Sequence, residues 1–447
     1  MTAKDPEGRR TARGSSWHRP LLGVALLVTA FALTWFRVPK QSRYQLWAED
    51  GRRFLGEALS TSDPLGNLLA PYAGYLHFIP RVVAAMTAAL FDVDHFPIVM
   101  TALSILASSA IAVMIFFLSW HLGLGAVGRF GVYGATFLAP ALSTEILGNT
   151  ANLHWFFLWL APWLFLHRPS RAREGVLWGL VGLAAALTEI QLVLFLPLLL
   201  WRPRVDHRLW LAGGAVSGAV AQILTTVSYP RSITSPPFEP TWSSVSLVAR
   251  GFTAHVGGGL WNATTPGPGL LGSLGWMGTS TLLLAPPAIA LMWLLHNRSR
   301  RLLGLYFFAA AGLLWVASSV LNNLPNEVLL PLQSVESAVP TGVLRHAVVP
   351  AWLLLAVIIV VVDEVLRGRP ARLGAVAASL LCALVLSTWA ANYYLDPWLR
   401  QQPSSWSEEV ERARTECSSG TADSVILHHP PATWGMAADC DAIKARS

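Results

Sequence analysis

The chain alternates long apolar runs with short polar connections that are rich in arginine. A helix of about 20 apolar residues crosses the hydrocarbon core of a bilayer, and runs near that length recur along the whole chain. The pattern therefore predicts an all-α integral membrane protein with about eleven transmembrane helices. The predicted crossings are 21–36, 98–120, 130–147, 152–166, two half-spans within 175–201, 209–227, 271–295, 302–321, 347–362 and 373–390.

Composition agrees with this pattern. The chain has 447 residues, of which 53% are hydrophobic and 13% charged, whereas a soluble domain carries about 25% charged residues. The net charge of +7 does not indicate a nucleic-acid partner, because its arginines cluster in the short loops that the positive-inside rule places in the cytoplasm. Scarce lysine and abundant alanine, leucine, glycine and valine suggest a GC-rich bacterial genome and hence the bacterial cytoplasmic membrane.

The loop charges also give an orientation. Residues 1–19 are polar and basic, which predicts a disordered cytoplasmic N-terminus. Residues 20–391 form the predicted transmembrane domain, with external loops at about 37–97, 228–270 and 322–346. The polar tail 392–447 then lies outside. The run from Tyr75 to Phe91 is long enough to span, but treating it as a span breaks the charge topology downstream, so we place it as an external juxtamembrane helix.

The segment 175–201 lies between two basic loops. A single span would put one of those loops outside, whereas two short helices hinged at 188–191 keep both inside. The hinge contains Glu189 and Gln191, and an ionised Glu in mid-hydrocarbon costs at least about 2.5 kcal/mol unless its place is wet or lined by protein. We therefore expect an embedded polar site here, the alternative being a protonated or hydrogen-bonded structural Glu.

Two adjacent carboxylates, Glu49 and Asp50, follow Trp47 just beyond the first apolar run. A carboxylate beside a bound hydroxyl group can act as a general base, and a neighbouring carboxylate can raise its pKa. The pair also suits a divalent cation such as Mg²⁺ or Mn²⁺. The alternative is that both charges are solvated in a loop. In a chain so poor in acidic residues, we expect the pair to be catalytic.

Basic and aromatic residues near the predicted outer surface are candidates for binding a phosphate. His77 and Arg81 are four residues apart and share a helix face next to Tyr75, and Arg345 with His346 stands at the mouth of a later span. Arginine matches phosphate oxygens in bidentate fashion. The alternative interpretation is an aromatic belt with arginines that reach the lipid head groups.

Glu145, Asn149 and His154 fall at the outer junction of two predicted spans. They either cap the helices there or line the polar site that the Glu49–Asp50 pair faces. Zinc-type spacing, a Walker A loop, a GxGxxG turn and a nucleophile elbow are missing from the sequence. Cys417 and Cys440 both lie in the tail, where an external location makes a disulfide between them plausible.

The layout resembles the GT-C superfamily of polytopic glycosyltransferases. The similarity covers roughly residues 20–230. It is carried by the acidic motif Ala48-Glu49-Asp50-Gly51 of the first external loop and by the juxtamembrane segment from Pro71 to His77 that follows it. The paired half-spans 129–167 and 175–201 add to it. The motif around Trp47 is also similar to uncharacterised actinobacterial membrane proteins with a cysteine-bearing external tail. Relatives often carry an Arg-Tyr pair where this chain has Arg345-His346, and a large C-terminal external domain is missing.

The resemblance implies an inverting transfer on the external face. The donor would be a polyprenyl-phosphate-linked sugar and the acceptor a glycan, lipid or protein of the cell envelope. Asp50 or Glu49 would take the proton from the acceptor hydroxyl group, while Arg345 first and Arg81 second would stabilise the departing phosphate.

Two other functions remain open at this point. A lipid or solute transporter, or a flippase, would use a pathway through the bundle with Glu189 as its charged relay. A non-catalytic assembly partner of the cell envelope would have a closed first loop without a cavity at Glu49 and Asp50.

Overall fold

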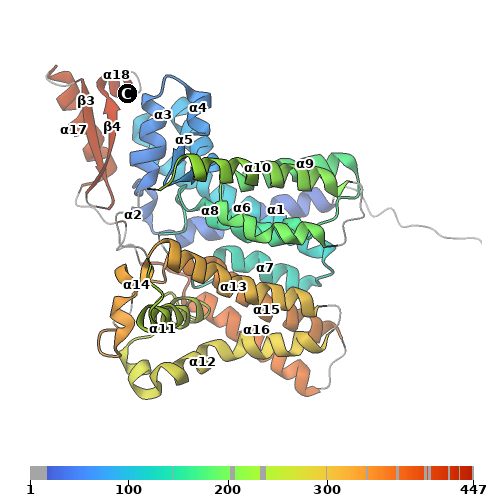
Figure 1. Ribbon diagram of the computed structural model, residues 1–447. Helices are drawn as coiled ribbons and strands as arrows, with labels where there is room; N and C mark the ends of the chain where they lie inside the picture. Colours follow the sequence, from blue (N-terminus) through green and yellow to red (C-terminus); the bar gives the residue numbers. More distant parts are fainter. Residues whose placement is uncertain are drawn as a thin grey trace, which may run out of the picture.

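The computed structural model describes residues 18–143, 145–201, 207–231, 238–297, 300–338, 341–368, 372–396, 400, 404–420, 423–431 and 433–444. The predicted disordered N-terminus lies almost wholly outside these residues. The described chain is mostly helical, with two short antiparallel sheets. Seven helices are long and apolar enough to cross a membrane. They are α1 (His18–Arg37), α6 (Phe96–His121), α10 (Arg208–Ser228), α12 (Pro268–His296), α13 (Arg301–Leu321), α15 (Val348–Arg367) and α16 (Arg372–Ala391), drawn in Figure 1.

Helix α15 forms the centre of the bundle. Every residue of α15 from Val348 to Asp363 is buried, and a helix that is hydrophobic all round is one that other helices surround. Trp352 stacks on Trp159 at a ring-centroid distance of 5.5 Å. The buried charge of Asp363 is satisfied because its carboxylate accepts hydrogen bonds from the backbone N–H groups of Gly125 and Gly128, at 2.8 and 2.9 Å.

Two of the predicted crossings are shorter in the structure. Helix α7 (Ala126–Leu138) and helix α8 (Leu153–Phe165) have 13 residues each, so the predicted span 130–147 is wrong beyond Leu138. The reason is Pro140, because the residue before a proline is disfavoured in a helix. Arg37 satisfies the freed carbonyl groups of Phe137 and Ala139 with hydrogen bonds of 2.6 and 3.1 Å. The count of about eleven crossings is not confirmed.

The predicted hinge is confirmed. Helix α9 (Ala172–Ala186) ends just before Glu189, and the 3₁₀ helix η3 (Ile190–Leu200) begins just after it. Arg208 donates hydrogen bonds to the carbonyl groups of Leu198, at 2.8 Å, and of Phe165. The far ends of η3 and α8 therefore lie together, as expected if the basic loops 168–173 and 202–208 share one end of the bundle.

Helices α9 and α10 pack unusually closely through glycines. A Cβ atom added at Gly214 would lie 2.0 Å from the carbonyl oxygen of Gly179, and one added at Gly179 would lie 2.6 Å from the carbonyl oxygen of Trp210. Only glycine allows the two backbones this approach. The contact fixes η3 and the Glu189 hinge through the helix that precedes them.

The other end of the bundle carries the long connections. The first contains α2 (Lys40–Arg43), the π-helical turn η1 (Asp50–Leu55), α3 (Gly56–Ser60), α4 (Pro64–Leu68), β1 (Pro71–Tyr72), β2 (Tyr75–Leu76), α5 (Phe78–Leu90) and η2 (Val93–His95). The second contains α11 (Trp242–Gly251) and η4 (Phe252–Gly257), and the third α14 (Leu324–Glu327), η5 (Leu330–Gln333) and η6 (Arg345–Ala347). The 13-residue α5 is too short to span, in agreement with its predicted juxtamembrane place.

The tail folds as a small subdomain. It consists of α17 (Trp406–Ser418), the antiparallel strands β3 (Ser424–His429) and β4 (Trp434–Asp439), and α18 (Cys440–Lys444). A disulfide joins Cys417 to Cys440, the pair expected from the sequence. Figure 1 shows this subdomain beside α3, α4 and α5, at the end of the bundle where the long connections lie.

The tail subdomain docks onto the first connection. The indole of Trp406 donates a hydrogen bond of 2.8 Å to the carbonyl group of Val93. Arg414 pairs with Asp94 at 2.6 Å, and the N–H group of Ala48 donates to the carbonyl group of Pro430 at 2.8 Å. The contact between Ala48 and Pro430 joins residues 382 positions apart and holds the segment that carries Glu49 and Asp50.

Candidate functional site

A cavity of about 350 Å³ lies where the three long connections meet the ends of the helices. Most of the residues singled out in the sequence line it. From the first connection and from α8, η3 and η6 these are Glu49, Tyr75, His77, His154, Glu189, Gln191, Arg345 and His346. Other lining residues include Phe54, Tyr72, Asn152, Trp155, Thr226, Arg231, Leu321 and Asn322. The structure thus brings together groups from five separate stretches of the sequence.

The two adjacent carboxylates point to different places. Glu49 lines the cavity, and the described residues offer it no ion pair or hydrogen bond. Asp50 is 2% exposed, and its two carboxylate oxygens accept hydrogen bonds from the backbone N–H groups of Thr150 and Ala151, at 2.9 and 2.7 Å. Ala48, just before them, has a left-handed φ of 42°. The sequence predicted that Glu49 or Asp50 faces the site; of the two, only Glu49 lines the cavity.

Asp50 is a structural group. Burial raises its pKa to about 7. The hydrogen bonds from Thr150 and Ala151 and the nearby Arg400 guanidinium act in the opposite direction. By holding the turn that precedes α8, Asp50 fixes the position of His154 and Trp155, which line the cavity. Asp50 therefore stabilises the wall of the cavity without facing the cavity itself.

Two arginines supply positive charge to the cavity wall. Arg345, at the start of η6, pairs with Glu145 at 2.9 Å. Arg231, after α10, donates a hydrogen bond of 2.8 Å to the side chain of Asn322 at the end of α13. Glu145 thus orients Arg345 and is not a free ligand. Its backbone carbonyl group also accepts hydrogen bonds from Asn149 and Asn152.

A row of rings forms one side of the cavity. The ring centroids of Tyr75 and His77 are 4.0 Å apart, those of His77 and His154 6.4 Å, those of His154 and Trp155 4.2 Å, and those of Trp155 and His346 5.5 Å. Burial lowers the pKa of His77 well below its ordinary value, and positive charge on His154 and Arg81 adds to this effect. His77 is therefore a neutral imidazole.

The hinge residues take part in the same cavity. One carboxylate oxygen of Glu189 is hydrogen-bonded to Nδ1 of His154, and the other accepts a hydrogen bond of 2.7 Å from the backbone N–H group of Gln191. The carbonyl oxygen of the Gln191 side chain accepts from the hydroxyl group of Ser318 at 3.3 Å. The carboxyl group of Glu189 is thus hydrogen-bonded and lined by protein, which lowers the cost of placing it inside the bundle.

Two predicted phosphate-binding residues do not line the cavity. Arg81 is fully buried, pairs with Glu57 at 2.8 Å and donates to the side chain of Asn67 at 2.8 Å. Asn149 accepts a hydrogen bond of 2.9 Å from the backbone N–H group of Asn152, so it stabilises the turn before α8. Both side chains are engaged within the protein: Asn149 bonds to residues of its own turn, as the capping alternative expected, whereas the partners of Arg81 lie on other elements.

Two residues that hold the first connection in place, Arg400 and His429, were not among the residues predicted from the sequence. Arg400 is buried, and its guanidinium lies over the ring of Trp47, 5.6 Å from the ring centroid. It also donates a hydrogen bond of 2.9 Å to the carbonyl group of Leu147. The ring of His429 lies so close to Gly51 that a Cβ atom there would come within 2.5 Å of its Nε2. A lone arginine and a histidine in a polar tail look like ordinary surface residues until the tail is docked.

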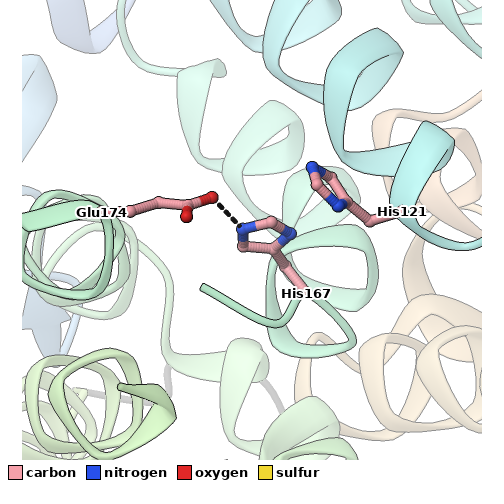
Figure 2. A group of neighbouring side chains, drawn as sticks. All are labelled: His121, His167 and Glu174. Carbon is pink, nitrogen blue, oxygen red and sulfur yellow. Dashed lines mark hydrogen bonds and ion pairs between the residues drawn. The ribbon is translucent and has the colours of Figure 1, made fainter. Parts of the chain in front are cut away.

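The divalent cation expected at Glu49 and Asp50 remains a prediction. Both oxygens of Asp50 already accept backbone hydrogen bonds, so Glu49 would have to bind such an ion with other groups. In the described part of the chain, three His, Cys, Asp or Glu side chains come close enough together for a metal ion only at the opposite end of the bundle, at His121, His167 and Glu174, drawn in Figure 2.

This cavity combines one unpaired carboxylate, two arginines and a row of aromatic rings. Such a set can bind an anionic group, pack the face of a ring and accept a proton. Comparisons of the chain with protein-family models, curated proteins and solved structures find no match. The chemistry of the cavity itself therefore carries the functional conclusion.

Proposed function

We propose that the protein is a membrane glycosyltransferase that takes a sugar from a polyprenyl-phosphate donor. The observation that carries this proposal is the common cavity of Glu49, Arg345 and Arg231. It offers a general base and two phosphate-binding cations within one site. Thr226 of α10 and Leu321 of α13 also line it, so the site lies at the ends of membrane helices, where a lipid-linked phosphate can reach it.

The proposed orientation rests on the two ends of the bundle. Arg300, before α13, donates to the carbonyl group of Gly123 at 3.1 Å and pairs with Glu364 near the end of α15 at 2.8 Å. With the Arg208 contacts, this brings the described flanks of the arginine-rich loops to the end of the bundle away from the cavity. The positive-inside rule then favours a cytoplasmic place for those loops and an external place for the cavity.

The proposed reaction is a single displacement. The carboxylate of Glu49 accepts the proton of the acceptor hydroxyl group while that oxygen bonds to the anomeric carbon of the sugar. The bond between the anomeric carbon and the phosphate oxygen breaks at the same time, and its electron pair leaves with the polyprenyl phosphate. The configuration at the anomeric carbon inverts.

The arginines act on the leaving group. Negative charge grows on the phosphate as the bond breaks, and fixed cations at that position stabilise the transition state. Arg345 is oriented by Glu145 and Arg231 by Asn322, so both guanidinium groups are held before the substrate arrives. The neutral ring of His77 and the rings of Tyr75 and Trp155 offer flat apolar faces that suit the faces of a sugar.

The packing of α8 beyond the cavity argues against the transporter alternative. His154 and Trp155 line its wall at the start of α8. One to two turns further along α8, Trp159 and Trp163 are completely buried and pack against each other at a centroid distance of 5.3 Å. This packing favours a site that opens at one end. The assembly-partner alternative expects a closed first loop, whereas Glu49 lines a cavity.

A binding experiment tests the phosphate site. The purified protein in lipid nanodiscs is titrated with farnesyl phosphate, and binding is followed by native mass spectrometry. Arg345→Ala and Arg231→Ala should each weaken binding about tenfold or more, since one charge-assisted contact is worth about 1.5–3 kcal/mol. Arg412→Ala, in the tail and outside the cavity, is the matched control and should bind like the wild type.

The outcomes separate the functions. Equal binding by the wild type and both cavity variants would refute the phosphate site. Scrambling of a labelled polyprenyl lipid across proteoliposomes, retained in Glu49→Gln, would favour a flippase. Sugar transfer from a panel of polyprenyl-phosphate sugars, lost in Glu49→Gln while binding persists, is the result that the proposal expects.

A further inference from the structure

A second cluster of chemically competent side chains lies at the arginine-rich end of the bundle, away from the cavity. His121 ends α6, His167 follows α8, and Glu174 stands in the first turn of α9. One ligand atom from each lies within 4.8 Å of the other two. Figure 2 shows the three side chains converging from separate segments of the chain.

The hydrogen bonds of Glu174 fix the tautomer of His167. One carboxylate oxygen of Glu174 is 2.9 Å from Nε2 of His167. The other accepts from the backbone N–H and the hydroxyl group of Ser170, at 2.7 and 2.8 Å. A carboxylate oxygen accepts hydrogen bonds, and the other oxygen of Glu174 already accepts two from Ser170. Glu174 is thus the acceptor of the contact with His167, so Nε2 of His167 carries the proton.

The other ring nitrogen of His167 therefore carries a free lone pair. Nδ1 is buried and has no hydrogen-bond partner in the described part of the chain, and the whole residue is 1% exposed. Figure 2 places this nitrogen on the side of the ring away from Glu174 and toward His121. The centroids of the two imidazole rings are 4.5 Å apart. A buried acceptor without a donor is costly, and a Lewis acid between the rings would satisfy it.

We propose that His121 and His167 bind a divalent transition-metal ion of the Zn²⁺ class, with Glu174 as the group that orients His167. The arrangement is that of a carboxylate–histidine–metal triad, in which the ligating histidine donates its second ring N–H to a carboxylate. Imidazole nitrogen favours Zn²⁺, Cu²⁺ and Ni²⁺ over Mg²⁺ and Ca²⁺. His121 is exposed, so solvent can complete the coordination shell.

The site has a definite energetic signature. Two imidazole ligands and water bind more weakly than the four ligands of a structural zinc site. The neighbouring Arg168 and Arg208 also repel a cation, so the lone pairs and not the local charge attract the metal. Because the ion joins the end of α6 to the segment after α8, it binds only the folded state and raises the unfolding temperature as its concentration increases.

Metal binding to the full-length protein tests the proposal. The purification tag is removed, the protein is treated with EDTA and dialysed in detergent, and ZnCl₂ is titrated by calorimetry alongside thermal unfolding. The expected result is a site of one Zn²⁺ per chain that raises the unfolding temperature, with no such rise from MgCl₂. His121→Ala should weaken this site at least tenfold. His296→Ala, which removes an exposed histidine at the end of α12, should leave it unchanged.

The variants keep the result interpretable. His121 is exposed, so its replacement does not endanger folding, whereas His167 is buried. Glu174→Gln should weaken the site less than His121→Ala, because it removes the orienting acceptor and not a ligand. Zn²⁺ binding that persists unchanged in His121→Ala overturns the proposal. So does the lack of any unfolding shift at concentrations up to about 100 μM, where a micromolar site would be saturated. Neither result depends on glycosyl transfer.

Discussion

Glu49 and Asp50 differ in role although they are neighbours in the chain. Asp50 is held by two backbone N–H groups, and Glu49 lines the cavity. The backbone reaches this arrangement through Ala48, whose positive φ is costly for a residue other than glycine. The N–H group of Ala48 is bonded to Pro430 of the tail. The tail therefore helps to determine which of the two carboxylates faces the cavity.

Glu49→Gln should lower the rate of sugar transfer about a hundredfold or more, because a general base accelerates a reaction by about 10²–10⁴-fold. The unfolding temperature should stay at the wild-type value, since Glu49 has no ion pair or hydrogen bond in the described structure. Transfer is measured with a labelled donor, and unfolding by fluorescence in detergent. Wild-type turnover by this variant would remove Glu49 from the mechanism.

Asp50 should make stability depend on pH. The unfolded carboxyl group loses its proton near pH 4, and the folded one near pH 7. The folded state therefore binds the extra proton between these values, so the contribution of Asp50 to stability falls by a few kcal/mol as pH rises from about 4 to about 7. Thermal unfolding of the wild type and Asp50→Asn between pH 4.5 and 8 measures this. The unfolding temperature of the variant relative to the wild type should rise across that range, and a constant difference would contradict the raised pKa.

The sequence pattern predicted many of the residues that line the cavity, but it did not predict which charged side chains pair with another residue of the protein. Glu49, His77, Glu189 and Arg345 were recognisable because only 13% of the residues in this chain are charged, so an acidic or basic group beside an apolar run is conspicuous. Arg81 looked equivalent to Arg345, but its partner Glu57 lies on another element. Such pairings depend on the tertiary fold, and the local spacing of residues does not contain them.

At the scale of elements, the contact between α9 and α10 offers a matched pair of substitutions. Gly214→Ala would push a methyl group to 2.0 Å from the Gly179 carbonyl oxygen, whereas a Cβ atom at Gly213 meets nothing within 4 Å. We expect Gly214→Ala to destabilise the protein by about 1–3 kcal/mol or more. Gly213→Ala should be neutral or stabilising by up to about 1 kcal/mol, since alanine favours the helix. Unfolding temperatures in detergent compare them, and equal values would contradict the close packing.

The disulfide should stabilise the docked tail. Cys417 and Cys440 are separated by 23 positions, and closing a loop of that size is worth about 3 kcal/mol in the unfolded state. Cys417→Ser with Cys440→Ser should speed hydrogen exchange in β3 and β4, and also in residues 46–56, which the tail holds. Exchange in α15 should not change, and Cys382→Ser is the control. Protection of residues 46–56 that survives the double substitution would show that the tail does not hold them.

The elements differ in how well the sequence predicts them. The hinge at 188–191 was predictable because basic loops flank an apolar stretch that contains Glu189. The early end of α7 was harder to see, since the apolar pattern continues through Pro140 into an irregular segment. Arg37 and Asp50 bond to backbone groups of that segment from other elements. Hydrophobicity alone cannot reveal such partners.

At the scale of the whole molecule, the orientation is testable by labelling. Asp63 is exposed in the connection near the cavity, and Arg171 is exposed in a basic loop. In a background with Cys382→Ser, Asp63→Cys should react with an impermeant maleimide in intact cells. Arg171→Cys should react only after the membrane is permeabilised, because positive loops stay inside. The reverse pattern would invert the topology and move the cavity to the cytoplasm.

The docking of the tail on the first connection has a consequence for biosynthesis. The ribosome completes residues 44–60 long before residues 400–440, at about 5–20 residues per second. The hydrogen bond from the Ala48 N–H group to the Pro430 carbonyl group, and the contact of Trp47 with Arg400, can form only after the tail has been synthesised. The carboxylate of Glu49 is therefore set in place only after the last helix has been inserted and the tail has folded. A newly made chain therefore completes the wall of the cavity late, and an unfinished molecule in the membrane lacks the tail contacts that hold Glu49.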